Sequence, residues 1–226
     1  SQRRPLTTLS RVTQMPIFPD YDSFAAAYEK GEAQIVSTRL VADLETPVSA
    51  MLKLTRSAKY SFLLESVEGG AVRGRYSIIG MNPDMIWKVA GSEASINRKA
   101  LHNPDGPFEP ARLAPLESLR ALLAESRITL GSDAPPMAAG VFGYIGYDMV
   151  RLMEDLPEPN PDTLGLPDGM MIRPTVMAIF DSVRDEVTVA LASSTRLFRL
   201  PPGALGDAAA VVTARFPGQR RSSVMQ

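Results

Sequence analysis

Few side chains in this 226-residue sequence are suited to nucleophilic catalysis or to metal binding. Cys is absent, which excludes disulfides and thiolate metal sites, and the one His, His102, lies beside an Asn-Pro-Asp-Gly stretch that is typical of a turn. The adjacent acids Glu154 and Asp155 have no further ligand residues nearby and lead into a proline-rich segment. We interpret this pair as a solvated acidic surface, and we expect no metal site in the chain.

Three glycines, Gly140, Gly143 and Gly146, recur at every third residue. This spacing matches neither a dinucleotide-binding fingerprint nor a P-loop, and no Lys-Ser or Lys-Thr step follows it. Because glycine has no Cβ, the series favours the close approach of two backbones. We therefore predict a buried strand over residues 138–147, in which the glycines serve packing.

A polar step ends one of the apolar runs. Residues 60–64 are compact and aromatic-rich, as is typical of a buried strand, and Glu65 and Ser66 close the run. A glycine-containing loop over residues 69–74 then leads to Arg75, which opens the next expected strand. Taken alone, Glu65 and Ser66 are typical of a solvated strand edge and a turn, and Arg75 is typical of a surface or salt-bridging arginine.

The succession of apolar runs and turn signals predicts an α+β fold, with a mostly antiparallel sheet covered by a few helices. A turn is expected over residues 82–84, and a long proline-rich loop or crossing segment over residues 157–174. Trp87, Tyr144 and Tyr147 are expected in the core. Helices are expected over residues 23–30, 47–58, 115–126 and 204–216. Strands are expected over residues 35–41, 60–66, 75–80, 85–90, 138–147, 176–180 and 186–191.

Charge and hydropathy disfavour two classes of partner. The Lys and Arg residues number 24 against 25 Asp and Glu, so a net charge of −1 provides no field of one sign to attract nucleic acid or an anionic membrane. No apolar stretch approaches the ~18 residues that a membrane-spanning helix needs, and no signal-peptide core follows the basic N-terminus. We therefore expect a soluble cytoplasmic protein with no nucleic-acid partner and no membrane partner.

Three passages, taken in order, resemble the N-terminal region of the anthranilate synthase component I family of chorismate-utilising enzymes. The first is Ala-Asp-Leu-Glu-Thr-Pro-Val-Ser-Ala at residues 42–50. The second joins Phe-Leu-Leu-Glu-Ser-Val-Glu at 62–68 to Arg-Tyr-Ser-Ile-Ile-Gly at 75–80, and the third joins Gly-Tyr-Ile-Gly-Tyr-Asp at 143–148 to Leu-Gly-Leu-Pro-Asp at 164–168. One passage alone is a weak signal, but three in this order are hard to obtain by chance. The resemblance covers about residues 15–200.

The resemblance implies the N-terminal half of a two-domain fold, with a flexible arm over residues 1–20, a regulatory domain over residues 21–216 and a frayed tail over residues 217–226. In such enzymes a lyase reaction converts chorismate to anthranilate and pyruvate with Mg²⁺, and a glutamine amidotransferase subunit supplies ammonia. The chorismate- and metal-binding residues lie in the C-terminal catalytic half, which we expect to be absent here. No catalytic residue is therefore carried over, and the chain alone is expected to be inactive.

The N-terminal half of such enzymes also supplies much of a feedback site for L-tryptophan, with the Leu-Leu-Glu-Ser sequence as its hallmark. The resemblance therefore assigns Glu65 and Ser66 to a tryptophan site, with Arg75 as the candidate for a basic residue found nine or ten positions downstream. A free amino acid needs a donor for its carboxylate, acceptors for its ammonium and an apolar slot for its indole. We expect Arg75 to supply the donor, Glu65 or nearby carbonyls to supply the acceptors, and Leu64 or neighbouring strand residues to supply the apolar slot.

Two other functions fit the same residues. One is the matching part of aminodeoxychorismate synthase, which shares the fold and can hold tryptophan structurally. The other is a stand-alone amino-acid-binding module or an adaptor for a glutaminase subunit. The Leu-Leu-Glu-Ser and Asp-Leu-Glu-Thr-Pro-Val passages favour anthranilate synthase over the first. The end of the chain after Arg-Arg-Ser-Ser at residues 220–223 is expected to be a truncation, which favours it over the second.

Overall fold

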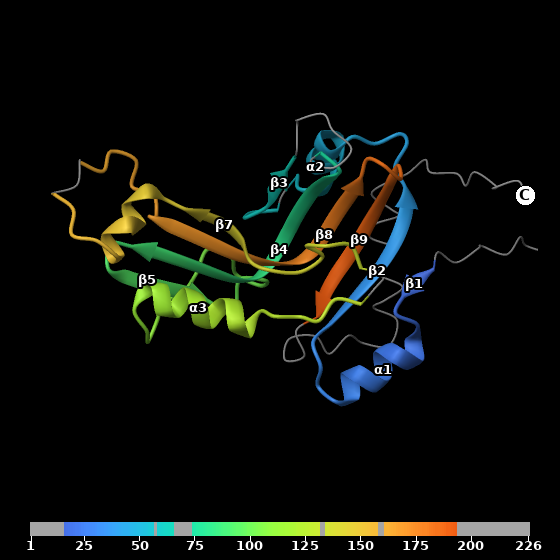
Figure 1. Cartoon of the computed structure of the whole chain (residues 1–226), viewed down its shortest axis with the longest axis horizontal. Coiled ribbons are helices and arrows are strands. Elements are labelled where there is room, and N and C mark those ends of the chain that lie inside the picture. Colours follow the sequence, from blue (N-terminus) through green and yellow to red (C-terminus); the bar gives the residue numbers. More distant parts are fainter. Residues whose placement is uncertain (1–15, 57, 66–73, 132–133, 158–160, 194–226) are drawn as a thin grey trace, which may run out of the picture.

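The computed structural model describes residues 16–56, 58–65, 74–131, 134–157 and 161–193 (Figure 1). The helices in this part are α1 (Tyr21–Glu29), α2 (Pro47–Leu54), α3 (Pro115–Glu125) and the 3₁₀ helix η1 (Tyr147–Leu152). The strands are β1 (Ile17–Phe18), β2 (Gln34–Val41), β3 (Phe62–Leu64), β4 (Tyr76–Ala90), β5 (Glu93–Asn97), β6 (Glu109–Pro110), β7 (Phe142–Ile145), β8 (Gly169–Asp181) and β9 (Glu186–Ser193). The helix expected over residues 204–216 and the tail after it lie outside the described residues.

The strands of the described part form one sheet in which neighbouring strands pair antiparallel. Their order is β1-β2-β9-β8-β4-β5-β6, and β3 joins the first half of β4 while β7 joins the first half of β8. The two longest strands, β4 and β8, lie side by side, and the other strands join the sheet through them (Figure 1). The predicted α+β fold with a mostly antiparallel sheet is confirmed.

The start of α2 follows the capping signal of the sequence, whereas the ends of several elements differ from expectation. The Thr46 hydroxyl accepts from the Ser49 amide over 3.1 Å and Ser49 Oγ accepts in return from the Thr46 amide, so a capping box starts α2. α2 then ends at Leu54, short of the expected residue 58. Pairing of β1 with β2 begins at Ile17, inside the segment expected as an arm, and β8 begins at Gly169, inside the expected proline-rich loop.

The turn expected over residues 82–84 is wrong, because β4 runs through this segment as one strand. The register of β4 against β8 shifts just after Pro83, which makes a β-bulge. Pro83 lies opposite Pro174, and neither proline has a backbone N–H to donate to the ladder. Asn82 adopts a positive φ of 53°, and the Thr175 hydroxyl donates to its carbonyl oxygen over 2.7 Å. The turn residues thus bend a continuous strand, because the apolar segments on both sides of them pair with β8.

A buried ion pair closes this bulge. Nε and Nη2 of Arg173 donate to the two carboxylate oxygens of Asp84 over 2.8 and 2.9 Å. The Arg173 and Asp84 side chains are 14% and 4% exposed. Nη1 of Arg173 donates to Ser126 Oγ over 3.3 Å and lies 3.7 Å from Glu125. The end of α3 is therefore attached to the bulge through Arg173.

Apolar clusters lie on both faces of the sheet. Ala50 and Leu54 of α2 pack into a cluster that contains Ile79 of β4. The next residue along the strand, Ile78, belongs to a different cluster that contains Ile179 of β8. Because successive side chains of a strand point to opposite faces, the helix α2 covers one face and leaves the Ile78 face to other segments.

The three aromatic residues expected in the core have different outcomes. Trp87 is fully buried in the cluster beside α3, and its Nε1 donates to Ser118 Oγ over 3.1 Å, which confirms the prediction. Tyr144 and Tyr147 are 43% and 85% exposed, so the prediction is wrong for them. The strand over residues 138–147 shortens to β7, which has β8 as its one partner among the described strands. An edge strand buries less of its side chains than an interior strand, which explains the exposure of Tyr144. Tyr147 lies after β7, at the start of η1.

The packing role predicted for the glycines holds for two of the three. A Cβ on Gly143 would lie 1.9 Å from the Met170 carbonyl oxygen, and a Cβ on Gly146 would lie 2.6 Å from the Asp168 carbonyl oxygen. Gly140 instead has a φ of 152° and only ordinary contacts with Phe142. Gly143 and Gly146 therefore allow the backbone of β7 to lie against β8.

We expect Asp84→Asn to lower the free energy of unfolding by about 3 kcal/mol, because Arg173 would keep a buried charge and lose its partner. A matched control is Asp105→Asn, since Asp105 pairs with Lys59 where both side chains are exposed. The control is expected to cost at most about 0.5 kcal/mol. Chemical denaturation followed by circular dichroism measures both changes, and equal losses would contradict the importance of burial.

We expect Gly143→Ala to lower the free energy of unfolding by about 2 kcal/mol, because the added methyl group must push β7 away from the Met170 carbonyl. Gly131→Ala is the control, since a Cβ there would meet no atom within 4 Å. Thermal unfolding ranks the two variants, and hydrogen exchange of the β7 amides locates the loss. A Gly143→Ala protein as stable as Gly131→Ala would show that the close approach is not needed.

Candidate functional site

The candidate site lies where β3 ends and β4 begins. Leu63 pairs with Ile79 and Leu64 pairs with Ile78 in an antiparallel register, so the chain leaves β3 beside the residues that open β4. Glu65 follows directly and its side chain is exposed. Ser66 lies outside the described residues, so its assignment to the tryptophan site stays a prediction.

Strand alternation places one apolar and one aromatic side chain of this site together. Leu64 lies opposite Ile78, so it shares a face with Ile78 and with Tyr76, two residues earlier in β4. Diagonal neighbours of this kind lie roughly 7–8 Å apart, within reach of an aromatic ring. Leu64 is 50% exposed, so the described residues leave half of this apolar side chain open to a ligand.

Arg75 is held firmly at the edge of the same site. Its Nε and Nη2 donate to the two carboxylate oxygens of Asp181 over 2.9 and 2.6 Å. Its guanidinium carbon lies 4.9 Å from the centre of the Tyr76 ring, a cation–π distance. The salt-bridging role that the sequence left open for Arg75 is therefore present, and it fixes the guanidinium over the Tyr76 ring.

The Arg75–Asp181 pair remains ionised across the ordinary range of pH. The hydrogen bond from Arg75 holds the pKa of the Asp181 carboxyl below its usual value, and the same bond raises the pKa of Arg75. Within the described residues, Nη1 of Arg75 makes no hydrogen bond, whereas Nε and Nη2 are used. One charged donor group of Arg75 is therefore available to a ligand carboxylate.

Asp181 and Tyr76 are the site residues that sequence reasoning missed. Asp181 opens the polar turn between β8 and β9, and its carboxylate also accepts from the amides of Val183 and Arg184 over 3.1 and 3.3 Å. An aspartate at this place in a hairpin predicts a turn cap, and nothing in its spacing indicates a partner 106 residues away. Tyr76 follows Arg75 directly, which was the available signal for a stacked pair.

No group of three His, Asp or Glu residues in the described part of the chain is placed to hold a metal ion. No helix of this part is long and apolar enough to cross a membrane.

Comparison with known proteins identifies the relatives of the chain. No family model matches it. Anthranilate synthase component 1 of Cereibacter sphaeroides is 54% identical over 169 residues, which are 75% of this chain and 34% of that protein. Over three quarters of its length the chain is therefore similar to a part of anthranilate synthase component I. Component 1 of Synechocystis sp. is 37% identical over 76% of the chain and 33% of its own length, and that of Thermus thermophilus is 40% identical over 64% and 29%.

The chain spans about a third of the length of these anthranilate synthase relatives, which fits the N-terminal region that the sequence passages indicated. A crystal structure of anthranilate synthase component I from Streptococcus pneumoniae aligns with a TM-score of 0.52 and 21% identity. The alignment covers 82% of this chain and 37% of that one. At this identity the likeness establishes the shared fold.

The Arg75–Asp181 pair makes the stability of the fold depend on pH in a defined direction. Because the pKa of Asp181 is lowered from 3.8, its stabilising contribution is present above that value and is lost as the pH falls through the lower pKa of the folded state. We expect Asp181→Asn to be less stable than the parent at neutral pH, with the difference shrinking below pH 3.8. Urea denaturation at a series of pH values measures the difference.

The control for this prediction is Asp185→Asn, on the same turn. The side chain of Asp185 is exposed and makes no ion pair with any described residue. Its difference from the parent is expected to stay near zero throughout. A constant difference for Asp181→Asn across the acid range would contradict the link to ionisation of Asp181.

Proposed function

We propose that this chain is the L-tryptophan-binding regulatory part of an anthranilate synthase large subunit in tryptophan biosynthesis. The complete enzyme acts as a lyase in the cytoplasm and converts chorismate and ammonia to anthranilate and pyruvate. A glutamine amidotransferase subunit supplies the ammonia. The C-terminal half of the large subunit binds chorismate and Mg²⁺, and the present chain alone is inactive.

The placement of Leu64, Tyr76 and Arg75 carries this proposal. An open apolar side chain shares a face with an aromatic ring, and a guanidinium with one uncommitted amino group lies on that ring. This set presents an apolar wall and a cation within one half-open site. A single small molecule with an apolar body and a carboxylate matches the set.

L-Tryptophan supplies the complementary groups. Its carboxylate accepts from Nη1 of Arg75, whose other two donor groups stay on Asp181. Its indole lies against Leu64. Glu65, exposed at the end of β3, provides an acceptor for the ammonium group, and Ser66 provides a further hydrogen-bonding group. The Asp181 anchor supports affinity, because an arginine fixed before the ligand arrives loses little side-chain entropy on binding.

Feedback inhibition follows if tryptophan favours one arrangement of the regulatory and catalytic parts over another. A ligand shifts such an equilibrium only by its difference in affinity for the two arrangements. Coupling of this kind is typically worth ~1–3 kcal/mol, which is enough to change chorismate affinity by ~5–150-fold. The names of the curated relatives favour anthranilate synthase over aminodeoxychorismate synthase and over a stand-alone binding module.

The test uses a large subunit of the relatives' full length that contains this chain, assayed with chorismate, ammonia and Mg²⁺. We expect Ser66→Arg and Arg75→Gln each to raise the L-tryptophan concentration that halves activity by at least about tenfold, since one charge-assisted hydrogen bond is worth about 1.5–3 kcal/mol. Inhibition is expressed against the uninhibited rate of each variant, so that a change in basal rate does not enter the comparison.

The matched control is Arg98→Gln, because Arg98 pairs with Glu125 on an exposed surface away from β3. Its inhibition curve is expected to follow the parent. Parental inhibition in both Ser66→Arg and Arg75→Gln would overturn the site. Anthranilate formation by the 226-residue chain alone would overturn the assignment of a purely regulatory part.

A further inference from the structure

A cavity of about 620 Å³ lies at the end of the sheet away from Arg75. Its walls come from the segment around β1, from the start of β2 and from the segment that follows α3. Phe18, Ile35 and Ile128 give it apolar walls, and each of these side chains is half-buried. A volume of several hundred Å³ with mixed walls is in the range of small-molecule sites, ~300–1,000 Å³.

The charged residues of this cavity are Arg127, Glu32 and Asp20. Asp20 is committed to the start of α1, where its carboxylate accepts from the amide and the hydroxyl of Ser23. Within the described part of the chain, the side chains of Arg127 and Glu32 form no ion pair and no hydrogen bond. The cavity therefore offers one uncommitted cation and one uncommitted carboxylate.

A neutral polar group adds to this set. Gln34 uses its side-chain N–H to donate to the Phe24 carbonyl over 3.0 Å. The Gln34 side-chain nitrogen is therefore used, and the side-chain oxygen remains as an acceptor for a second donor. The acceptors Glu32 and Gln34 suit an ammonium group, and Arg127 suits a carboxylate.

The chemistry of the walls selects the class of ligand. A purely apolar ligand would leave Arg127 and Glu32 without partners, and a polyanion would be repelled by Glu32 and Asp20. A small zwitterion with a bulky apolar body satisfies both charges and the apolar walls. We infer that this cavity binds a free α-amino acid with a large apolar side chain, through Arg127, Glu32 and the Phe18 wall.

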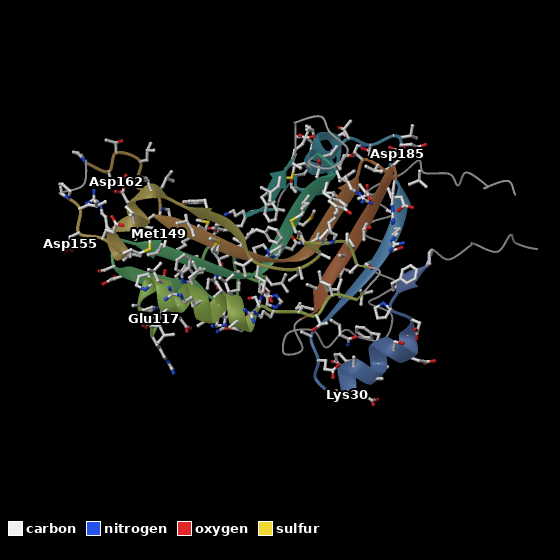
Figure 2. The ribbon with its side chains drawn as sticks, viewed as in Figure 1. Lys30, Glu117, Met149, Asp155, Asp162 and Asp185 are labelled. Carbon is white, nitrogen blue, oxygen red and sulfur yellow. The ribbon has the colours of Figure 1, made fainter. Side chains whose placement is uncertain are left out.

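This cavity is separate from the site at Arg75. Gln34 lies in the cavity wall and Val41 lies at the far end of the same strand, about 20 Å away at 3.3 Å per residue. Val41 pairs with Glu186, which pairs with the Arg75 partner Asp181. Figure 2 shows the same separation, with Lys30 at the end of α1 and Asp185 in the β8–β9 turn on opposite ends of this part of the sheet. One ligand molecule cannot occupy both sites.

The cavity also lies beside a smaller one that the buried Asp84–Arg173 ion pair lines. Ile128 and Ala33 line both this cavity and a small one of about 30 Å³ that contains Asp84 and Arg173. Arg127 directly follows Ser126, the residue that bonds Arg173. A ligand held by Arg127 therefore contacts the chain segment that anchors the buried ion pair.

The experiment is isothermal titration calorimetry of the 226-residue chain with L-phenylalanine, L-leucine and L-tryptophan as probes. We expect at least one of them to bind, and Arg127→Gln and Glu32→Gln each to weaken that binding at least about tenfold through loss of a charge-assisted hydrogen bond. 3-Phenylpropionate, which lacks the ammonium group, is expected to lose affinity in Arg127→Gln and to be unaffected by Glu32→Gln.

Arg120→Gln and Glu93→Gln are the matched controls, because both side chains are exposed and neither lines the cavity. The Arg75→Gln variant tests which of the two sites binds the amino acid. Binding lost in Arg75→Gln and kept in Arg127→Gln would overturn this cavity and leave the tryptophan proposal standing. Binding lost in Arg127→Gln and kept in Arg75→Gln would support amino-acid binding in this cavity. Absence of binding by all three amino acids would overturn the inference, with circular dichroism showing that each variant is folded.

Discussion

The antiparallel ladder between β4 and β8 is the constraint on which the rest of the structure depends. The first half of β4 takes β3 as its other neighbour and the second half takes β5, while β8 takes β7 and then β9. The change of neighbours happens at the bulge, where two prolines face each other and remove ladder hydrogen bonds. The Asp84–Arg173 pair compensates for this weakness with bonds between side chains across the same two strands.

The candidate site depends on this ladder directly. Tyr76 is opposite Asp181 in the register, so the first residue of β4 meets the last residue of β8. Arg75, one residue before the strand, reaches the Asp181 carboxylate from this position. A slip of one residue in this ladder would place Tyr76 opposite a different residue and move Arg75 away from the Asp181 carboxylate. The geometry around Arg75 is thus set by pairing along the whole length of two strands.

Sequence reasoning predicted most elements because their signals are local. Thr46 and Pro47 mark the start of α2 by capping chemistry, and the polar residues 181–185 separate two β-branched runs into a hairpin. It failed where a tertiary partner decides the outcome. Residues 82–84 carry turn signals, yet β8 pairs with the segments on both sides and converts the turn into a bulge. Tyr144 and Tyr147 belong to an apolar run, yet Tyr144 lies on the edge strand β7 and Tyr147 lies after it in η1, and both are exposed.

The same difference between local signals and tertiary partners decides which residues of the proposed sites could be predicted. Leu64, Glu65 and Arg75 could be named from the Leu-Leu-Glu-Ser passage and the cation after it, because a short segment of sequence carries them. The Asp181 anchor and the cavity around Arg127 could not be named, since each joins segments that are distant in sequence and become neighbours only through the sheet.

Both proposed sites touch one packed cluster. Ile35, in the wall of the cavity at Arg127, and Tyr76, beneath the guanidinium of Arg75, pack against the same buried residues. These buried residues include Ile78, Met177, Ile179 and Ala190, from three adjacent strands. Protein interiors are close-packed, so a change in side-chain volume at one edge of such a cluster requires its neighbours to adjust. The face of the sheet that α2 leaves uncovered therefore connects the end that carries Arg75 to the end that carries Arg127. At each end the arginine lies beside an apolar wall.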